Sequence, residues 1–406
     1  MTHPLPIEVV IFGGGAAGLW LLDELVRAGR STLLLEAHEL GSGQTIASQG
    51  IIHGGLKYSL SGLLTPSARA ISQMPLIWRR CLAGEAKPDL TSTRLRAEFC
   101  YLWRTTSLRS RLAMIGARAG LQVSPVKLSE AERPAALAEC PGVVARLDEQ
   151  VIDPLSLIAD LSNQHAGRII RIDAANGLEF VCRGAGEIEV IRLINPETGD
   201  PLDVVAEHVI FAAGAGNAKL RDMAGLEPGA MQRRPLHMVM ARGGNLPVLN
   251  AHCVDGRATR VTITSTRDFD DRIVWQIGGQ IAEAGTSMSP DALIAFAKSE
   301  LAAVLPGLRL RNVEWATYRV DRAEAATAGG ARPDEAFAQR TGNTVTAWPT
   351  KLALVPVMAD RVRQLIPQEV ERLREQAAPD HVLKHWPRPV VALPPWETHD
   401  QWNIDD

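Results

Sequence analysis

One short pattern at the start of the chain limits the folds that it can adopt. An apolar strand is predicted at residues 7–12, followed by the small-residue segment 13–18, a helical run, and a second apolar strand that ends on Glu36. A strand, a glycine-rich turn, a helix and another strand in this order form a unit whose strands lie in one parallel sheet. The chain is therefore predicted to begin with an α/β domain of the Rossmann type.

The glycines of this segment stand where a dinucleotide requires them. Gly13 permits the tight turn after the strand, Gly15 has no Cβ to hold a pyrophosphate away from the backbone, and Gly18 lets the helix pack closely on the sheet. Ala16 and Ala17 begin the helix, where free amide groups and the positive end of the helix dipole favour phosphate. The spacing predicts a pyrophosphate site at these residues.

Glu36, at the end of the second strand, completes the pattern. A carboxylate there can accept hydrogen bonds from both ribose hydroxyls of an adenosine, and Ala37 is assigned to the same contact. A phosphate on that ribose would be repelled, so FAD or NAD is predicted and NADP is not. Ordinary loops can also be glycine-rich, so the interpretation depends on the strand, helix and acid around the glycines.

Length and composition describe a globular protein with more than one domain. The 406 residues exceed the size at which a single core keeps growing, and the formal net charge of −3 lacks the basic surplus that nucleic-acid binding needs. No apolar stretch is long enough to cross a bilayer, although peripheral membrane association stays open. Nothing before the first strand resembles a secretion signal, so a cytoplasmic location is expected.

The cysteines favour buried thiols over a metal or redox site. They are scattered, odd in number, and form no Cys-x-x-Cys pair; they are Cys81, Cys100, Cys140, Cys182 and Cys253. This spacing argues against a disulfide framework, a zinc site and a redox dithiol, and no metal site is predicted.

A loop rich in small, hydroxyl and amide residues follows Glu36, where a plain NAD domain would continue with another helix. It ends in the run Ile52-His53-Gly54-Gly55-Leu56-Lys57-Tyr58. This run resembles the His-Gly-Gly-Leu-Arg-Tyr signature of the glycerol-3-phosphate dehydrogenase branch of the D-amino-acid oxidase superfamily, whose members bind FAD. The resemblance implies FAD as the cofactor and makes several loop residues its neighbours, namely Gln44, Thr45, Ser48, Gln49, Gly50 and His53.

Two later segments resemble further FAD-contacting parts of this family. A buried strand predicted at 204–211 ends in a run of small residues, and the resemblance makes Ala213 and Gly214 contacts of FAD. Without a ligand, the same run would be an ordinary strand-to-helix turn. The loop Thr350-Lys351-Leu352 replaces the family's glycine-rich loop before the last helix. Lys351 is a candidate for stabilising negative charge on reduced flavin, or else a solvated lysine.

The resemblance and the strand patterns together predict two domains. An FAD-binding domain of the glutathione-reductase-type Rossmann fold is predicted at residues 1–85, 150–228 and 313–376. A smaller α+β substrate domain with an antiparallel sheet is predicted at residues 86–149 and 229–312.

Residues 377–406 are rich in proline and tryptophan. They are predicted to form an extended arm that packs on the body, on a second copy of the chain, or on another protein.

The resemblance implies an FAD-dependent oxidase or dehydrogenase that oxidises a C–N or C–O bond of a small acidic substrate, an amino acid or a hydroxy acid. Arg319 keeps the arginine of the family's Arg-Pro pair and is expected to bind the substrate carboxylate, although Val320 replaces the proline. An ion pair with Asp321 or Glu314 is the structural alternative, and Lys57 is an alternative cation.

His53 and His237 are the candidate bases, because imidazole titrates near neutral pH and can take the proton of the reacting heteroatom. Either could instead be a structural hydrogen-bonding residue, and amine oxidation can proceed without a protein base. Two other functions stay open. A flavin monooxygenase shares this nucleotide domain, and a non-catalytic flavoprotein could use the arm to bind a partner.

Overall fold

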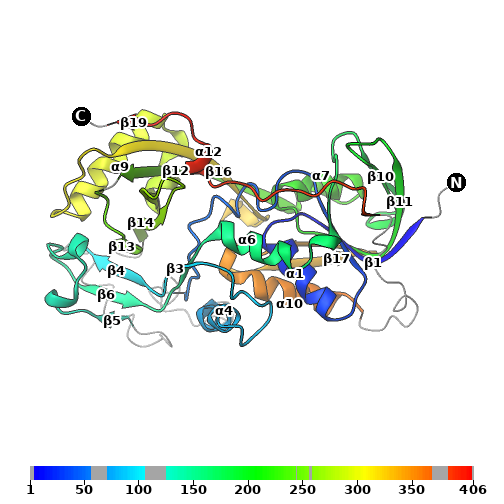
Figure 1. Cartoon of the computed structure of the whole chain (residues 1–406), viewed down its shortest axis with the longest axis horizontal. Helices are drawn as coiled ribbons and strands as arrows, with labels where there is room; N and C mark the ends of the chain where they lie inside the picture. The colour runs from blue at the N-terminus through cyan, green and yellow to red at the C-terminus, as the bar shows by residue number, and fades with distance from the viewer. Residues whose placement is uncertain are drawn as a thin grey trace.

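Two sheets lie at opposite ends of the long axis of the molecule (Figure 1). The computed structural model describes residues 4–55, 71–105, 125–243, 245–255, 258–367 and 383–404. Lys57 therefore lies outside the described residues. Within these ranges, every helix is too short or too polar to span a membrane.

The first sheet has a parallel centre, with β1 between β2 and β11. An antiparallel hairpin, β9 and β10, joins it at β11. In spatial order, the main path contains β17 (Phe337–Thr341), β18 (Thr344–Trp348), β11 (Pro201–Phe211), β1 (Leu5–Phe12), β2 (Thr32–Glu36) and β8 (Ile169–Arg171), and the hairpin consists of β9 (Leu178–Gly184) and β10 (Glu187–Ile194).

Strand β1 is buried on both faces because helices and strands cover both. Val9 and Ile11 belong to one core cluster, and Val10 and Phe12 belong to another on the opposite face. The elements that complete these two layers are α1 (Ala16–Arg27), α4 (Met74–Leu82), α6 (Pro154–Asn163) and α10 (Val355–Leu365) in the first, and α7 (Asn217–Met223) in the second.

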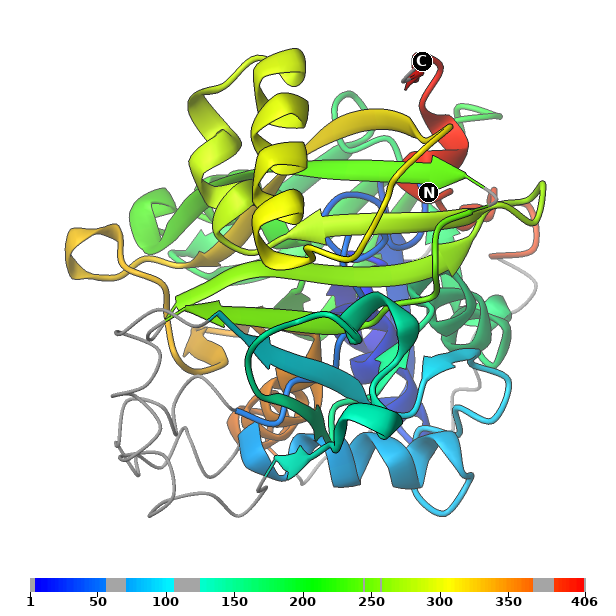
Figure 2. The same cartoon turned by 90° about the vertical axis from the view of Figure 1, so that its left-hand side faces the viewer.

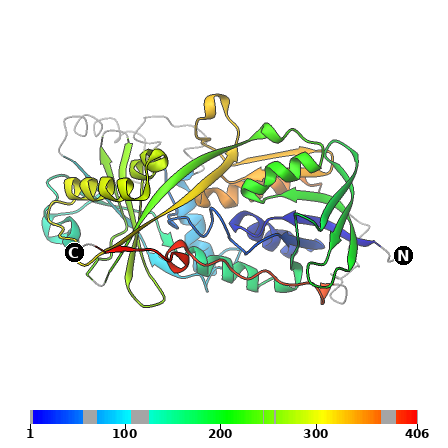
Figure 3. The same ribbon diagram turned by 90° about the horizontal axis from the view of Figure 1, so that it is seen from above.

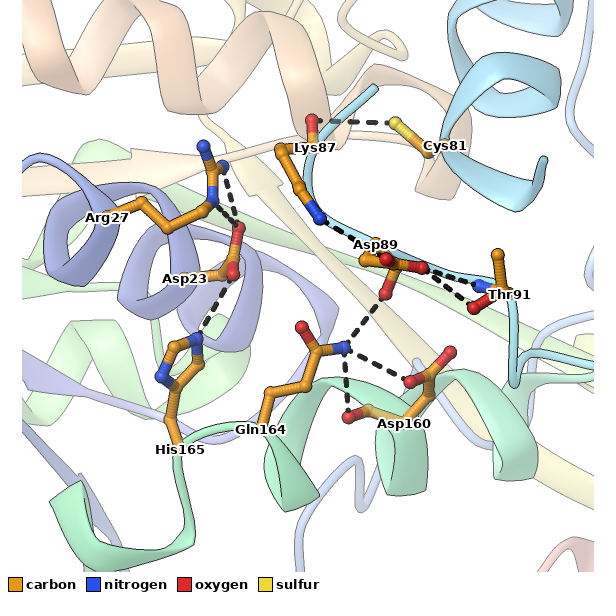
Figure 4. Close-up of polar contacts among 9 residues, drawn as sticks. All are labelled: Asp23, Arg27, Cys81, Lys87, Asp89, Thr91, Asp160, Gln164 and His165. Atoms are coloured by element: carbon orange, nitrogen blue, oxygen red, sulfur yellow. Dashed lines mark hydrogen bonds and ion pairs between the residues drawn. The ribbon is translucent and has the colours of Figure 1, made fainter. Parts of the chain in front are cut away.

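A polar contact joins α1 to the residues that follow α6 (Figure 4). The Asp23 carboxylate, only 2% exposed, accepts from Arg27 at 2.7 Å and lies 3.1 Å from Nε2 of His165. Burial acts to raise the pKa of Asp23, but the hydrogen bonds to His165 and Arg27 outweigh it and leave that pKa lowered. Gln164, at the end of α6, donates to the backbone of Asp89 and to Asp160.

The second sheet is antiparallel except where β13 runs parallel to β4. Helices α8 (Gln280–Ala284) and α9 (Pro290–Val304) pack on one of its faces (Figure 2). In spatial order, the strands are β19 (Asn403–Ile404), β16 (Glu314–Ala325), β12 (Met231–Gly243), β15 (Ile273–Gly278), β14 (Ala258–Arg267), β13 (Ala251–Asp255), β4 (Cys100–Arg104), β6 (Val144–Leu147) and β5 (Val126–Lys127).

Strand β16 differs from the expected domain division. Residues from 313 onward were assigned to the FAD-binding domain, but β16 pairs with β12 from Glu314 to Ala325 and so belongs to the second sheet. The chain returns to the first sheet only at β17. The cross-strand pairs between β12 and β16 place β16 in the second sheet. These pairs join residues far apart in the sequence, so a local pattern could not predict them. The other predicted boundaries remain predictions.

The C-terminal arm, as far as residues 383–404 describe it, runs along the body from the first sheet to the second (Figure 3). Trp386 is buried in a core cluster of the first sheet, and Val391 forms a bridge with Leu40. Trp396 then packs on Met240, and β19 pairs with β16. Strands β3 (Leu95–Ala97) and β7 (Val151–Ile152) form a separate short pair, and the arm contains the short helix α12 (Pro395–Thr398).

Candidate active site

A cavity of about 1090 Å³ is lined by parts of both sheets. Its walls combine the carboxyl ends of β1, β2 and β11 with side chains of β12 and β16. Ligands of open parallel sheets bind outside the carboxyl ends of the strands, and typical small-molecule pockets measure roughly 300–1,000 Å³. The cavity is therefore large enough for an extended dinucleotide.

The glycine turn has the shape that its sequence indicated. Gly13 has a φ of +107°, and a Cβ there would lie 2.5 Å from Cα of Ala213. At Gly18, a Cβ would lie 1.9 Å from the backbone oxygen of Gly13, so helix α1 could not approach the strand with any side chain there. Gly15 faces the cavity, where a Cβ would meet only the Thr45 hydroxyl, at 3.1 Å.

The start of α1 offers amide groups to the cavity. Its first residue, Ala16, has a backbone N–H 3.4 Å from the Thr45 hydroxyl, and the N-cap residue Gly15 makes no side-chain cap. Unsatisfied amides and the helix dipole favour a phosphate at this position. The hydroxyl of Ser48, also on the cavity, is buried and lacks a hydrogen-bond partner among the described residues. These donors fit the pyrophosphate and the polar chain of FAD.

Two backbone amides hold the Glu36 carboxylate at the end of β2. One oxygen accepts from Gly14 at 2.5 Å and the other from His38 at 2.8 Å, and the side chain lines the cavity. A carboxylate has about four acceptor positions, so room remains for the ribose hydroxyls.

The predicted FAD neighbours come together although they are far apart in sequence. All of them except Gly18 line this one cavity, and Gly18 instead sets the distance between α1 and β1. In the two later segments, the Gly214 carbonyl accepts from Trp348 at 3.1 Å, and Thr350 has a positive φ of 64°. The individual contacts with FAD remain predictions. The residues placed on the cavity are Gly13, Gly15, Ala16, Ala17, Glu36, Ala37, Gln44, Thr45, Ser48, Gln49, Gly50, His53, Ala213, Gly214, Thr350, Lys351 and Leu352.

His53 lies beside a carboxylate and a second histidine. Its Nδ1 is 3.4 Å from Oε2 of Glu149, and Nε2 of His252 is 3.5 Å from the same oxygen. The group can also be considered as a metal site, because its three ligand atoms lie within 4.8 Å of one another. The prediction of no metal site was based on the cysteine spacing, which gives no information about a group made of two histidines and a glutamate. Sequence reasoning missed Glu149 and His252, and no local motif marks either residue.

His237 is placed in the core and not on the cavity. It is 1% exposed, and its ring nitrogens contact the Gly285 carbonyl at 3.0 Å and the Thr317 hydroxyl at 2.9 Å. Burial lowers its pKa. These contacts support the structural alternative for His237, although its role as a base remains an untested prediction.

Arg319 borders the cavity, but its guanidinium donates to the backbone oxygens of Thr286 and Met288, each at 3.0 Å. Successive side chains of a strand point to opposite faces. The side chain of Tyr318 accordingly turns the other way, and its hydroxyl donates to the Ala47 carbonyl at 2.9 Å. Neither Asp321 nor Glu314 is the partner of Arg319. The contacts do not support its role as a substrate clamp, which stays a prediction.

Two other arginines on the cavity have unsatisfied donors. The Nε atoms of Arg322 and Arg332 are buried and lack a hydrogen-bond partner among the described residues, whereas another nitrogen of Arg322 pairs with Glu283 at 3.3 Å. Burial lowers the pKa of Arg322, and the neighbouring Arg332 and Arg234 add to this effect. Sequence reasoning missed both residues, because neither the face of β16 that carries Arg322 nor the course of the loop that carries Arg332 was known.

The chain is similar to flavoproteins over most of its length. The family described as DAO, FAD dependent oxidoreductase, matches residues 8–347. The chain is 41% identical over 405 residues to the probable FAD-dependent oxidoreductase PA4991 of Pseudomonas aeruginosa, with 98% of this chain and 99% of that protein covered. It is 23% identical to one of the subunits of the anaerobic glycerol-3-phosphate dehydrogenase of Escherichia coli, over 69% of this chain and 48% of that one.

Solved structures share the architecture. The crystal structure of PA4991 matches with a TM-score of 0.79 at 37% identity and covers 98% of this chain and 99% of that chain. Glycine oxidase from Geobacillus kaustophilus matches with a TM-score of 0.64 at 18% identity, over 91% and 97% of the two chains, and this likeness concerns the fold alone. The predicted fold class and the predicted cofactor, FAD, are confirmed. The chain belongs to the DAO family of FAD-dependent oxidoreductases.

Proposed function

We propose that this flavoenzyme oxidises a C–N or C–O bond of a small acidic substrate, an amino acid or a hydroxy acid. The observation that carries the proposal is the shared cavity. The glycine turn and Glu36 line it together with His53 and the two arginines that have unsatisfied donors. A dinucleotide site that continues into a cationic region with a histidine suits oxidation of an anionic molecule.

Bound FAD supplies the hydride acceptor, so the chain itself has to hold the substrate and manage one proton. Arg322 and Arg332 are the groups proposed to bind the acidic end, because buried guanidinium donors are satisfied best by a carboxylate or phosphate. His53 is proposed to take the proton from the nitrogen or oxygen of the reacting carbon. The partial loss of water around His53 lowers the pKa of its imidazole, although Glu149 acts to raise it, and this keeps the ring neutral and able to accept a proton at pH 7.

An anaerobic reduction experiment tests this function. The purified protein, with its FAD content measured from its absorbance spectrum, is mixed with amino acids and hydroxy acids in the absence of oxygen. The panel includes both chemical classes, since the similar proteins include a glycine oxidase and a glycerol-3-phosphate dehydrogenase. Bleaching of the flavin by one class supports the proposal. A flavin bleached by NADH and by no member of the panel would instead indicate the monooxygenase alternative.

We further propose that the protein acts in the cytoplasm. Four of the five cysteines are buried as free thiols, and Cys182 is exposed and also unpaired. Free thiols are kept reduced in that compartment.

The arm exposes the apolar side chains of Val390, Leu393 and Ile404, which supports a contact with a second copy of the chain. Light scattering of the purified protein measures that assembly.

A further inference from the structure

Glu149 lies between two imidazoles beside the cavity. The three residues come from separate segments: His53 from the loop after Gly50, Glu149 from the turn between β6 and β7, and His252 from β13. Oε2 of Glu149 faces both rings, at 3.4 Å from Nδ1 of His53 and 3.5 Å from Nε2 of His252. The two rings are 5.7 Å apart between centroids.

Two further atoms of this group have partners. Oε1 of Glu149 accepts from the backbone of Gly54 at 2.8 Å, and Nδ1 of His252 contacts the Thr262 hydroxyl at 3.0 Å. Gly54 follows His53 in the chain, so the Glu149 carboxylate contacts both the His53 ring and the backbone of the loop that carries it. Glu149 thereby determines how the His53 ring is oriented.

The carboxylate is buried and needs compensating charge. Glu149 is 3% exposed, and an isolated buried anion is strongly unfavourable. Burial acts to raise the pKa of Glu149, but the contacts and charges of His252 and His53 outweigh it, so its pKa is lowered. Two further titratable groups interact with this cluster: the charge of Glu149 helps to raise the pKa of Cys100, and the charge of Lys351 helps to lower the pKa of His53. Glu149 stays ionised, and its negative charge is available to the two rings.

His53 is open to the cavity, unlike its two partners. Its side chain is 40% exposed, compared with 5% for Glu149 and 7% for His252. With Nδ1 directed at Glu149, the neutral ring keeps its proton on Nδ1 and its lone pair on Nε2. This tautomer is the one that can accept a proton from a molecule in the cavity.

We propose that Glu149 and His252 are positioning residues that prepare His53 as the base of the flavin reaction. This inference rests on the proposed function. When the substrate N–H or O–H bond breaks, its proton forms the Nε2–H bond of His53, and Glu149 stabilises the resulting imidazolium without taking the proton itself. His252 supports the carboxylate by proximity alone, because its Nε2 lies 3.5 Å from Oε2 and makes no hydrogen bond among the described residues.

The first experiment measures the histidines themselves and needs no substrate. The FAD-loaded protein, labelled with ¹⁵N in its histidine rings, is titrated by NMR, and the His53 signal is assigned with His53→Asn. Glu149→Gln keeps the shape of the side chain and removes its charge, so the His53 midpoint should fall by about one pH unit. His252→Asn retains a group at the position of Nδ1 and removes an imidazole that acts to lower the pKa of His53, so it should not lower the midpoint as Glu149→Gln does. His165→Asn changes a comparable histidine–carboxylate pair outside the cavity (Figure 4) and should leave the midpoint unchanged.

Two results would overturn the proposal. The first is an unchanged His53 midpoint in Glu149→Gln. The second is a stoichiometric metal ion in the purified protein that is lost in Glu149→Gln, because the three side chains would then be metal ligands.

The second experiment uses whichever amino or hydroxy acid reduces the flavin. Glu149→Gln should lower the limiting rate of reduction about 10²-fold with little change in KM, and the acid limb of the pH profile should move to lower pH. A rate within twofold of the wild type, at equal FAD content, would contradict the proposal. If no member of the panel reduces the flavin, the proposed function fails by itself, and the NMR titration still decides whether Glu149 controls the His53 proton.

Discussion

The hydroxyl of Tyr318 donates a hydrogen bond to the backbone oxygen of Ala47 at 2.9 Å. Tyr318 belongs to β16 of the second sheet, and Ala47 belongs to the loop that follows Glu36, 271 positions away in the sequence. The same hydroxyl accepts from the side-chain amide of Gln276 at 2.9 Å. Burial raises the pKa of Tyr318, so the hydroxyl stays protonated and able to donate. The contact joins the second sheet to the loop that follows Glu36, at the cavity.

Replacing Tyr318 by Phe should loosen this junction. The change removes the closer partner of both the Gln276 amide and the Ala47 carbonyl, which keep a longer contact with each other at 3.4 Å, and such a loss typically costs about 1–3 kcal/mol. Chemical denaturation of the FAD-loaded protein measures the loss. Tyr101→Phe is the matched control in the same sheet, and it should change stability by less than about 0.5 kcal/mol. Equal stabilities of the two variants would show that the Tyr318 hydroxyl contributes nothing.

Two glycines of the opening turn should fail in different ways. Gly18→Ala places a Cβ against the Gly13 carbonyl and should destabilise the fold by about 3 kcal/mol. Gly15→Ala meets only the Thr45 hydroxyl, so it should fold normally but bind FAD about tenfold more weakly. Denaturation and FAD titration separate the two effects. Gly167→Ala, at a position with nothing within 4 Å, is the control and should change neither.

The cavity arginines should control binding of the acidic group. Arg322→Gln and Arg332→Gln should each raise the KM for an acidic substrate about 10–100-fold, because a charge-assisted hydrogen bond contributes about 1.5–3 kcal/mol. Arg319→Gln, whose guanidinium is bound to carbonyl oxygens, should leave KM within about threefold while lowering stability. Steady-state kinetics of the three variants measure these KM values and show which arginine binds the acidic group. A large KM effect in Arg319→Gln alone would restore the clamp expected from the family's Arg-Pro pair.

Stability should fall in mild acid because of His208. This residue is 6% exposed on β11, and burial lowers its pKa to about 4, with a smaller contribution from Arg340 and Arg30. Between pH 6.5 and 4 the unfolded chain binds a proton at His208 and the folded protein does not, so stability decreases as pH falls through this window. From pH 7.5 to pH 5 the loss should be about 2 kcal/mol.

His208→Gln is the variant that isolates this effect. Glutamine cannot be protonated in this range, so the difference in stability between pH 7.5 and pH 5 should shrink by about the same 2 kcal/mol. Denaturation curves at the two pH values, for wild type and variant, measure it. Identical pH dependence in both proteins would assign the acid sensitivity to other groups.

The dinucleotide site could be predicted from the sequence because its signals are local. The turn at Gly13, the close packing at Gly18 and the acid at the end of β2 each follow from a few neighbouring residues. The segments around Ala213 and Lys351 were found by resemblance to a family, and all of these residues reach the same cavity.

The surroundings of the reacting group could not be predicted in the same way. His53 and Glu149 are 96 positions apart, and His252 lies on β13 of the second sheet, far from both in the sequence. No spacing rule links such residues, because their contact depends on how the two sheets pack. The assignment of Arg319 illustrates the same limit, since a strand pattern shows that neighbours alternate but not which of them faces the ligand.

The sequence by itself determined the cofactor class and the first βαβ unit, because backbone conformation at glycine and hydrophobic periodicity act over short distances. Only the tertiary structure decided that β16 belongs to the second sheet, that Nε of Arg322 lacks a hydrogen-bond partner among the described residues while Arg319 is held by carbonyl oxygens, and that Glu149 lies between two histidines. Those outcomes depend on strand register and on the packing of distant segments, which are properties of the whole fold.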